Sequence, residues 1–579
     1  MAKPTTGGIA GRLFRGYGPL IGFAAMFTAM ALLVPSVDKE LVRQVNVDPA
    51  TLTEAASGDE ADGAASEVLD ETAIAADDTV VDPLAAGDGT DPASAAGGGA
   101  LGSATARTGG AAAKAGSPGA PGQAQACTGR QVKADPYSPP CRTWTGGDNG
   151  GATSQGVTGT DIVISVRIQS FASGLVDAIS KKAGAELPPE DESDIVRTLE
   201  GLVEYFNKAY QFYGRKLKLE IYTGRGDVLK EVLGGGQEFA RNDALKVAQE
   251  IKAFADVSAI TPPYIDALAS QRVIAVGAPY LSRAWMTQRA PYVWSQFIDC
   301  SAIAENVTSY YLSRMAGKPA QNAGGSLSSQ PRKLGIVVPN SSWYQDCLQD
   351  GLNQLRKGGV EPADVVPYTP DLNTMTTQSA TIISRLQQAG VTSVACFCDP
   401  LLLGVLTPKA SEQNYTPEWL NTGVALTDQD IVGRLFDKNQ WSRSIGISYS
   451  GATVAQGRGV GYSAYKAVRK DEPSIGVDLM YAQLQLVAIG VQMAGPKLNP
   501  AEFQRGMFEY PESKGQLGTW KFGPGDYTTS EDSREIYWNP NQKSIQTGKA
   551  GAYVETEPNR RYRIGEYGPS GGLIPGIGG

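Results

Sequence analysis

The segment KLGIVVPNSSWYQDCLQDGLNQLRK, residues 333–357, decides the fold. Its first six residues, KLGIVV, form a short apolar run that is typical of a buried strand. The polar turn PNSS follows, and residues 345–357 then predict a helix. Strand, turn and helix in this order make up the repeating unit of a parallel α/β sheet.

The same order continues on both sides of this segment. C-terminal to it, we predict strands at 364–368 and 393–397, helices at 376–389 and 401–413, and a short strand reached through 418–421. N-terminal to it, we predict strands at 160–168, 216–222, 257–260 and 273–276, and helices at 194–213, 243–254, 264–270 and 302–315. The sequence therefore predicts two successive α/β units, each with a doubly wound parallel sheet.

Beyond these units the pattern is sparser. Residues 476–494 predict a later amphipathic helix, and 520–522 and 535–539 predict terminal strands. The tail after residue 568 is rich in glycine and proline, and we expect it to be unstructured.

The N-terminal region has the pattern of a membrane segment. Lys3, Arg12 and Arg15 precede a strongly apolar run at 20–34. With its neutral flanks this run approaches the roughly 20 residues that span a bilayer. The preceding positive charge predicts that the N-terminus lies inside and the bulk of the chain outside. A cleaved signal peptide would look similar, but no A-x-A site follows the run, so we expect residues 1–38 to form an uncleaved anchor.

Residues 40–126 consist mainly of Ala, Gly, Asp, Glu, Thr and Pro, with almost no aromatic side chains. Such a segment cannot bury enough apolar surface to offset its ordering entropy. We therefore expect residues 39–150 to form a disordered acidic tether that ends in a Cys-bracketed segment.

The composition argues against catalysis and against nucleic acid as a partner. The formal net charge is −9, and the chain has no histidine. The lack of histidine excludes Ser-His-Asp and Cys-His catalysis and the usual zinc ligands. Neither a G-x-S-x-G nor a P-loop motif is present, and GRGVG at 457–461 is expected to be a glycine-rich loop. We expect a protein that is not an enzyme and that has no metal or cofactor.

The six cysteines suggest disulfides, because their number is even and the chain is expected to be exported. Cys127 and Cys141 bracket CTGRQVKADPYSPPC, and we predict that they are bonded. The remaining four allow three full pairings: Cys300, Cys347, Cys396 and Cys398. We favour Cys347 with Cys398, because the helix after KLGIVV and the end of the CFC strand should be neighbours.

Four blocks carry a resemblance to a known family: GVTGTDIVISV (156–166), GLVEYFNKAYQFYGRKLKL (201–219), KLGIVVPNSSWYQDCLQDGL (333–352) and YAQLQLVAIGVQMAG (481–495). In their order and spacing the chain resembles the type I periplasmic binding proteins, specifically the branched-chain-amino-acid-like substrate-binding proteins of ABC transporters. The similarity spans about residues 156–545.

The resemblance implies two lobes joined by a hinge, which close on a ligand. We expect lobe 1 at 151–297, lobe 2 at 298–451, a return to lobe 1 at 452–525, C-terminal strands at 526–560 and a disordered tail at 561–579.

Ligands of open α/β sheets bind beyond the C-terminal ends of the strands, so the candidate site residues come from loops that follow strands. In the first lobe these are Gln169, Ser170, Phe171, Thr261 and Ser282. In the second lobe they are Trp343, Tyr344, Asp399 and Asp428.

The resemblance places Thr261 and Ser282 near hydroxyl positions that bind a carboxylate, and Asp428 near the acid that binds an amine. Each has an alternative structural role. Ser, Thr and Asp in such loops also cap the following helix, and Trp343 and Tyr344 could be packing residues.

One loop departs from the family pattern. Where the family carries several small hydroxyl residues, this chain has ITPPY at 260–264. This departure, together with aromatic bulk near the cleft, favours a larger or flatter molecule over an α-amino acid.

We therefore expect an extracytoplasmic binding protein that captures a small organic solute and delivers it to an ABC transporter permease. The candidate solutes are amino-acid-like molecules, amides and small aromatic acids. The alternative is a membrane-anchored ligand-sensing receptor with the same fold.

Overall fold

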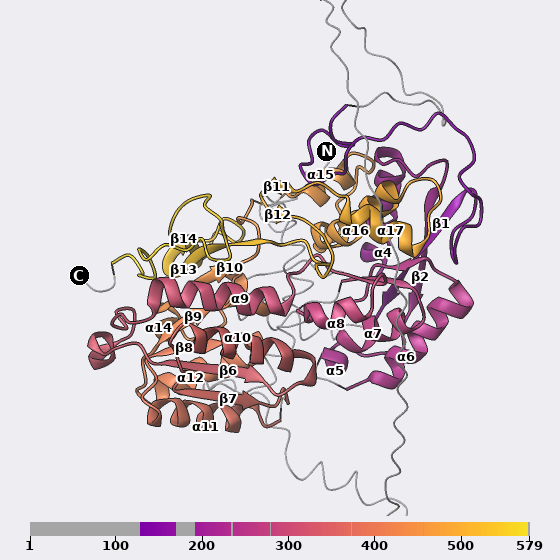
Figure 1. Cartoon of the computed structure of the whole chain (residues 1–579). Helices are drawn as coiled ribbons and strands as arrows, with labels where there is room; N and C mark the ends of the chain where they lie inside the picture. Colours follow the sequence, from indigo (N-terminus) through magenta and orange to yellow (C-terminus); the bar gives the residue numbers. More distant parts are fainter. Residues whose placement is uncertain are drawn as a thin grey trace, which may run out of the picture. The chain divides into compact units, whose positions relative to one another are not determined.

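The computed structural model describes residues 128–169, 192–232, 235–277, 280–371, 373–455 and 457–576, all of which belong to one compact unit by their contacts (Figure 1). The expected membrane segment, most of the expected tether, Cys127, Ser170 and Phe171 lie outside the described residues.

The first sheet has five parallel strands in the order β2-β1-β3-β4-β5. The strands are β1 (Asp161–Ile168), β2 (Lys216–Thr223), β3 (Ala255–Asp256), β4 (Ile274–Val276) and β5 (Val293–Trp294). Six of the eight residues of β1 are buried, as expected for a parallel strand covered on both faces.

The second sheet repeats this order. Its parallel strands run β7-β6-β8-β9-β10, so the chain builds both sheets in the sequence 2-1-3-4-5. The strands are β6 (Leu334–Pro339), β7 (Asp364–Tyr368), β8 (Ser393–Cys396), β9 (Glu418–Asn421) and β10 (Ser444–Ser448). The α/β fold with parallel sheets is thereby confirmed.

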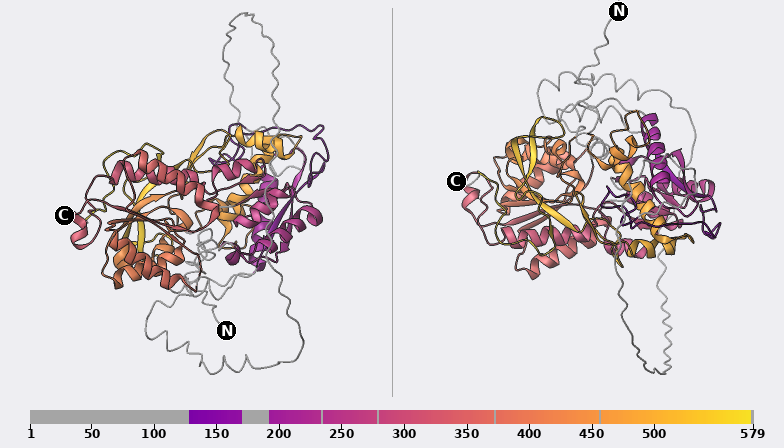
Figure 2. Two further views of the ribbon diagram at one scale, coloured as in Figure 1. Left: turned by 60° about the horizontal axis from the view of Figure 1, so that its bottom comes forward. Right: turned by 90° about the horizontal axis from the view of Figure 1, so that it is seen from above.

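The last strands of the chain extend the second sheet. Strand β13 (Asp532–Lys543) pairs antiparallel with β10, and β14 (Ala550–Glu555) and β15 (Tyr562–Arg563) pair antiparallel with β13. Figure 2 shows these yellow strands beside the orange and red strands of the second sheet. A separate hairpin joins β11 (Ser513–Gly515) and β12 (Gly518–Trp520).

Helices cover both faces of each sheet. Around the first sheet they are α4 (Glu192–Ala209), α5 (Val228–Val232), α6 (Gln237–Leu245) with its π-helical continuation η2 (Lys246–Ile251), α7 (Pro262–Ser270), α8 (Arg283–Gln288), α15 (Val460–Lys466), α16 (Val477–Ala494) and α17 (Pro500–Phe508). Helix α16 packs against α4, α15 and α17, and α6 packs against α7.

Around the second sheet, the helices and short helical turns are α9 (Cys300–Tyr310) with its π-helical continuation η3 (Tyr311–Met315), η4 (Gly325–Ser329), η5 (Ser342–Tyr344), α10 (Gln345–Lys357), α11 (Met375–Gln388), α12 (Pro400–Glu412), η6 (Val424–Leu426), α13 (Asp430–Gly433) and α14 (Lys438–Trp441). Helix α9 packs against α10 and α11 packs against α12, and Figure 1 shows α9 and α11 on opposite sides of strands β6 and β8.

The chain passes between the two sheets three times, after β5, after β10 and after β12. Two hydrophobic cores correspond to the two sheets. One contains buried residues from 137–294 and 464–527, and the other is built mainly from 298–449 and 538–574. Three chain crossings therefore connect the two cores, and hinges between domains lie in connecting segments of this kind.

Several predicted elements are displaced in the structure. The predicted strand at 257–260 is a loop, and the strand is β3, two residues earlier. The prediction placed the strand too late because β3 contains an acidic residue, Asp256. Its side chain is buried and accepts hydrogen bonds from Ser165 and Ser258. An acid inside a buried strand breaks the apolar pattern on which the prediction relied. The following elements were not predicted: α5, α8, β5, α13, α14, β10, α15, α17, β11, β14 and β15.

Two terminal segments are ordered, contrary to prediction. Part of the expected tether packs on the first core: Asp135 accepts a hydrogen bond from Tyr481 on α16 at 2.9 Å, and Tyr137 donates one to the Gly518 carbonyl at 2.7 Å. The expected disordered tail packs on the second core, where the Ile574 amide donates to the Asn322 side chain at 2.9 Å. Long-range polar contacts of this kind leave no local signal in a Gly/Pro-rich sequence.

Among the described residues, one helix, α16, is long and apolar enough to cross a membrane, and 78% of that stretch is buried inside the protein. Its side chains form much of the first core. We therefore assign α16 to the core of the first unit.

Candidate functional site

The strand order of each sheet reverses between its first and third strands. In the first sheet this point lies between β1 and β3, and in the second between β6 and β8. Open α/β sheets bind ligands in the crevice beyond the carboxyl ends of the strands at such a point. A ligand site is therefore expected among the residues that follow these four strands.

A cavity of about 410 Å³ lies at this place. Residues that follow β6 and β8 line it, including Ser341, Ser342, Trp343, Tyr344 and Asp399. From the first unit the lining residues are Val232, Gln237, Ile260, Pro262 and Tyr280. The cavity is thus bounded by both α/β units, and its volume is in the range of small-molecule sites.

Three polar side chains of the second unit meet in the cavity wall: Tyr344, Tyr368 and Asp399. Tyr368 at the end of β7 donates a hydrogen bond to an Asp399 carboxylate oxygen at 2.5 Å. Asp399 also caps α12, since its other oxygen accepts from the amides of Leu401 and Leu402 at 2.8 and 3.1 Å. A carboxylate can accept about four hydrogen bonds, so Asp399 keeps capacity for a ligand donor.

Burial shifts the titration of this group of residues. Desolvation raises the pKa of Asp399, and the hydrogen bond from Tyr368 opposes that shift. Desolvation, helped by the charge of Asp399, raises the pKa of Tyr344 to about 12. At neutral pH the Tyr344 hydroxyl is therefore protonated and can donate a hydrogen bond to a ligand.

Tyr280 joins the two units at the edge of the cavity. Its hydroxyl accepts a hydrogen bond from the backbone amide of Ala425 at 3.0 Å. Tyr280, Ala425 and Leu426 all have left-handed backbone conformations, with φ of 61°, 49° and 61°. Residues other than glycine rarely adopt this conformation, and it is concentrated at functional sites.

The Trp343 ring makes a second contact between the units. It lies 6.0 Å from the Trp285 ring of α8, edge to face, and packs against the core of the first unit. Trp343 therefore serves both the cavity wall and the interface between the units.

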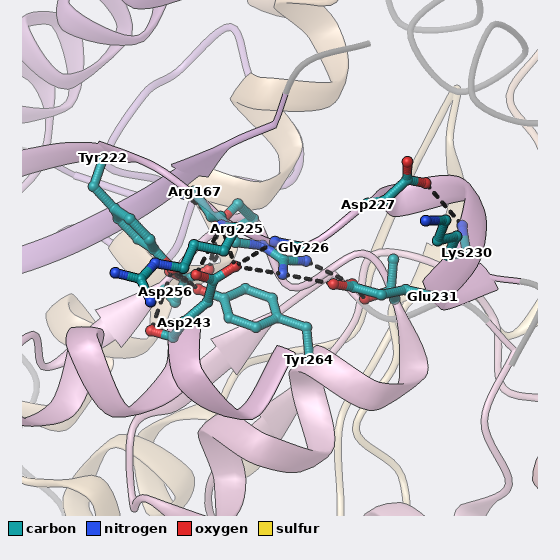
Figure 3. Close-up of polar contacts among 12 residues, drawn as sticks. Arg167, Tyr222, Arg225, Gly226, Asp227, Lys230, Glu231, Asp243, Asp256 and Tyr264 are labelled. Carbon is teal, nitrogen blue, oxygen red and sulfur yellow. Dashed lines mark hydrogen bonds and ion pairs between the residues drawn. The ribbon is translucent and has the colours of Figure 1, made fainter. Parts of the chain in front are cut away.

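A buried polar network holds the first-unit side of the cavity (Figure 3). Arg167 on β1 donates two hydrogen bonds to Glu231 on α5, at 2.9 and 2.8 Å, and a third to Asp243 on α6 at 3.2 Å. Its guanidinium lies 3.5 Å from the centre of the Tyr264 ring. The network fixes α5, whose Val232 lines the cavity and whose Val228 packs into the second core.

Thr261 belongs to this network. Its side chain is fully buried and donates a hydrogen bond to Glu231. Its neighbours Ile260 and Pro262 line the cavity, whereas Thr261 is not among the lining residues. The Thr261 hydroxyl therefore acts on the site through the position of α5.

The structure brings together three of the predicted site residues, Trp343, Tyr344 and Asp399. Ser282 instead caps α8, accepting from the Trp285 amide at 3.1 Å. Asp428 is buried and accepts hydrogen bonds from Ser448 at 2.6 Å and Gln429 at 3.2 Å. Neither Ser282 nor Asp428 is among the residues that line the cavity. Ser170 and Phe171 lie outside the described residues.

Tyr280 and Tyr368 were missed by the sequence predictions. Tyr368 was predicted as the last residue of a strand, and the rule that strand ends form the site would have found it. Tyr280 follows β4 by four residues, but its partner Ala425 is 145 residues away, so no local pattern indicates the contact.

A second cavity of about 610 Å³ shares Tyr280 with the first. The three crossings between the sheets line it, together with the ordered segment 134–137. Tyr280 therefore stands between a cavity at the switch points and a cavity at the chain crossings.

The cysteine pairing differs from the prediction. Disulfides join Cys300 with Cys347 and Cys396 with Cys398, so the predicted Cys347–Cys398 pair is wrong. Cys300 begins α9 and Cys347 lies in the first turn of the neighbouring helix α10, and their Cα atoms are 5.7 Å apart, within the range that a disulfide bridges. Cys127 lies outside the described residues, so its pairing with Cys141 stays a prediction.

Comparisons with known proteins give similarity of fold alone. No protein-family model matches the chain, and no curated protein matches it. A solute-binding protein of an ABC transporter from R. palustris, in complex with 4-hydroxybenzoate, has 12% identity and a TM-score of 0.47 over 70% of this chain and 97% of that one.

Two other solved structures are similar at the same level. The branched-chain amino acid transporter substrate-binding protein of Streptococcus pneumoniae, in complex with isoleucine, has 14% identity and a TM-score of 0.44 over 68% of this chain and 100% of that one. A fatty acid ABC transporter substrate-binding protein from Thermomonospora curvata has 14% identity and a TM-score of 0.46 over 72% and 98%. At these identities and TM-scores the similarity decides neither ligand nor partner. In the arrangement of its elements, the chain is similar to the solute-binding proteins of ABC transporters.

Proposed function

We propose that the chain binds a small organic molecule in the cavity at the two switch points, releases it unchanged, and delivers it to an ABC transporter permease. The observation that carries this proposal is the position of the 410 Å³ cavity, which is lined from both α/β units beyond the carboxyl ends of their strands. A molecule bound there touches both units and favours the arrangement in which they meet.

The chemistry of the lining residues supports binding rather than turnover. The chain has no histidine to serve as a general base. Cys300, Cys347 and Cys398, which line the cavity, are held in disulfides and offer no thiolate. The Asp399 carboxylate caps α12 and accepts a hydrogen bond from Tyr368, and its remaining acceptor capacity can hold a ligand donor. Within the described residues, no cluster of three potential metal ligands is present.

Transfer to a permease and attachment to the membrane complete the proposal. The family resemblance of the blocks at 156–166, 201–219 and 333–352 supports the transport role. The apolar run at 20–34 with preceding positive charge supports an N-terminal anchor that places the binding unit outside the membrane.

The test is a set of thermal melts of the full chain with amino acids, amides and small aromatic acids, followed by recovery of each compound. A compound that binds only the folded state raises the melting temperature, and a concentration of 100 Kd stabilises the protein by about 2.7 kcal/mol. We expect at least one shift, with the compound recovered intact. The proposal fails if no compound shifts the melting temperature while one of them is chemically converted.

A further inference from the structure

The cavity does not end at the polar residues beside Asp399. It continues between helices α9 and α10 and the second sheet, where its walls are apolar. Side chains of α9, α10 and the sheet form this inner part: Ile303, Val307, Leu352, Leu355, Ile336 and Ala395. Protein cores are normally packed to the density of organic crystals, so a void that extends into a helix–sheet interface is a built feature.

Two observations explain how the inner part is kept open. Helices α9 and α10 meet through small residues, since a Cβ added at Gly351 would lie 3.4 Å from the Ala304 Cβ. The Cys300–Cys347 disulfide also fixes the beginnings of the two helices to each other. The close contact and the disulfide hold α9 and α10 together as one wall of the inner part, so the cavity is pre-formed.

The polar end of the cavity is acidic rather than basic. Asp399, Tyr344 and Asn340 line it, and no Lys or Arg is among its described lining residues. Helix α7, which faces it from the first unit, begins with Pro262 and Pro263. Proline has no amide hydrogen, so the first turn of α7 lacks two of the donors with which a helix N-terminus holds an anion.

We propose that the ligand is an amphipathic molecule whose alkyl chain or apolar ring lies between α9, α10 and the second sheet, and whose uncharged or cationic polar end lies beside Asp399 and Tyr344. This inference rests on the proposed function and names its ligand class. An apolar cavity of this kind stays dry when empty and binds apolar molecules, so each methylene that enters it adds to the affinity.

The probes are straight-chain primary amides from butanamide to decanamide, titrated into the full chain by calorimetry. We expect the dissociation constant to fall about fourfold per added methylene until the inner part is full. Octanamide, octylamine and octanoate then compare head groups at constant chain length. We expect octanoate to bind at least tenfold more weakly than the other two, because no Lys or Arg is among the described lining residues and the two prolines that begin α7 donate no amide hydrogen to a carboxylate.

Variants separate the inner part from the polar end. Val307→Phe on α9 fills the void, so we expect decanamide binding to fall at least tenfold, butanamide binding to stay within threefold, and the melting temperature to stay the same or rise. Ala395→Leu on β8 is a second filling variant with the same expected effects, because Ala395 also lines the inner part. Val405→Phe on α12 is the control, because Val405 is buried but is not among the lining residues, and overpacking there should lower the melting temperature.

The outcomes are distinguishable from failure of the proposed function. If amides bind with an affinity that is independent of chain length and insensitive to both filling variants, the inner part is not a ligand site, while a binding protein remains. If octanoate binds most tightly, the head-group assignment is overturned. If Val307→Phe lowers the melting temperature as much as Val405→Phe, there is no void to fill. If nothing in either series binds and the thermal melts also fail, both proposals fall.

Discussion

The hydroxyl of Tyr280 accepts a hydrogen bond from the backbone amide of Ala425 at 3.0 Å. Tyr280 follows β4 of the first sheet, and Ala425 follows β9 of the second sheet. Both residues have positive φ angles, so the backbone on each side is held in a rarely adopted conformation where the units touch. Tyr280 also lines both cavities. This contact therefore reports directly on whether the two units are together.

Tyr280→Phe removes the acceptor and leaves the Ala425 amide without its partner in a buried place. An unsatisfied buried donor costs about 1–3 kcal/mol, so we expect the Ala425 amide to exchange its hydrogen roughly tenfold faster. Hydrogen exchange followed by NMR measures this rate. Tyr292→Phe, at a half-buried tyrosine of the same unit, is the control. Equal exchange rates in the two variants would show that the hydrogen bond does not hold the units together.

Tyr344→Ala should weaken binding of any compound that shifts the melting temperature by roughly tenfold, because the ring forms part of the cavity wall and its loss forfeits about 1.5 kcal/mol of apolar contact. Tyr537→Ala is the matched control, since Tyr537 is also half-buried in the second unit but is not among the lining residues. Calorimetric titration gives the affinities, and melts without ligand give the stabilities. Tyr344 would be identified as a packing residue if the two variants lost the same affinity, or if Tyr344→Ala lowered the melting temperature without weakening binding.

Glu231→Ala should lower the free energy of unfolding by about 3 kcal/mol, because it leaves the buried guanidinium of Arg167 without its main partner. The control is Asp266→Ala, which breaks the half-exposed pair of Asp266 with Arg289 in the same unit. We expect that change to cost at most about 1 kcal/mol. Urea unfolding measures both.

The double variant Arg167→Met/Glu231→Leu completes this test. It removes the Arg167–Glu231 charge pair but leaves the buried Asp243 carboxylate without the Arg167 guanidinium, so we expect it to recover part of the stability that Glu231→Ala loses. A double variant as unstable as the single one would mean that the network acts through packing rather than through paired charge.

The two disulfides should differ in their contribution to stability. Cys300 and Cys347 are 47 residues apart, whereas Cys396 and Cys398 are 2 apart. By the chain-entropy relation the first contributes roughly 4 kcal/mol and the second about 1 kcal/mol. Urea unfolding of the two double-serine variants measures the difference. Non-reducing peptide mapping checks the pairing, and a Cys347–Cys398 peptide would contradict it.

The order of strands and helices could be predicted because its signals are local. Helix α10 and strand β7 coincide with the predicted ranges 345–357 and 364–368. Strands β3 and β5 contain two residues each, too few for any periodicity to show. Their position is set by pairing with neighbouring strands rather than by their own sequence.

Some residues of the candidate site were likewise predictable from local sequence, and others were not. Trp343, Tyr344 and Asp399 follow long predicted strands, and the general rule for open sheets placed them in one cavity. Thr261 was expected to bind a ligand because its loop position suggested it, but its hydroxyl is taken by Glu231 on α5, a helix that was not predicted. Side-chain partners that come from another element decide such roles, and one sequence does not show them.

The most direct measurement is hydrogen exchange by mass spectrometry of the full chain, with and without the compound that raises the melting temperature most. Binding in the cavity predicts slower exchange in the segments after β6, β8 and β9, at 340–344, 397–402 and 424–427, and in the first-unit loop at 257–264, with no change in β14. Protection on both units would support a ligand held between them. Protection that is confined to other segments, or absent while the compound is bound, would contradict the account.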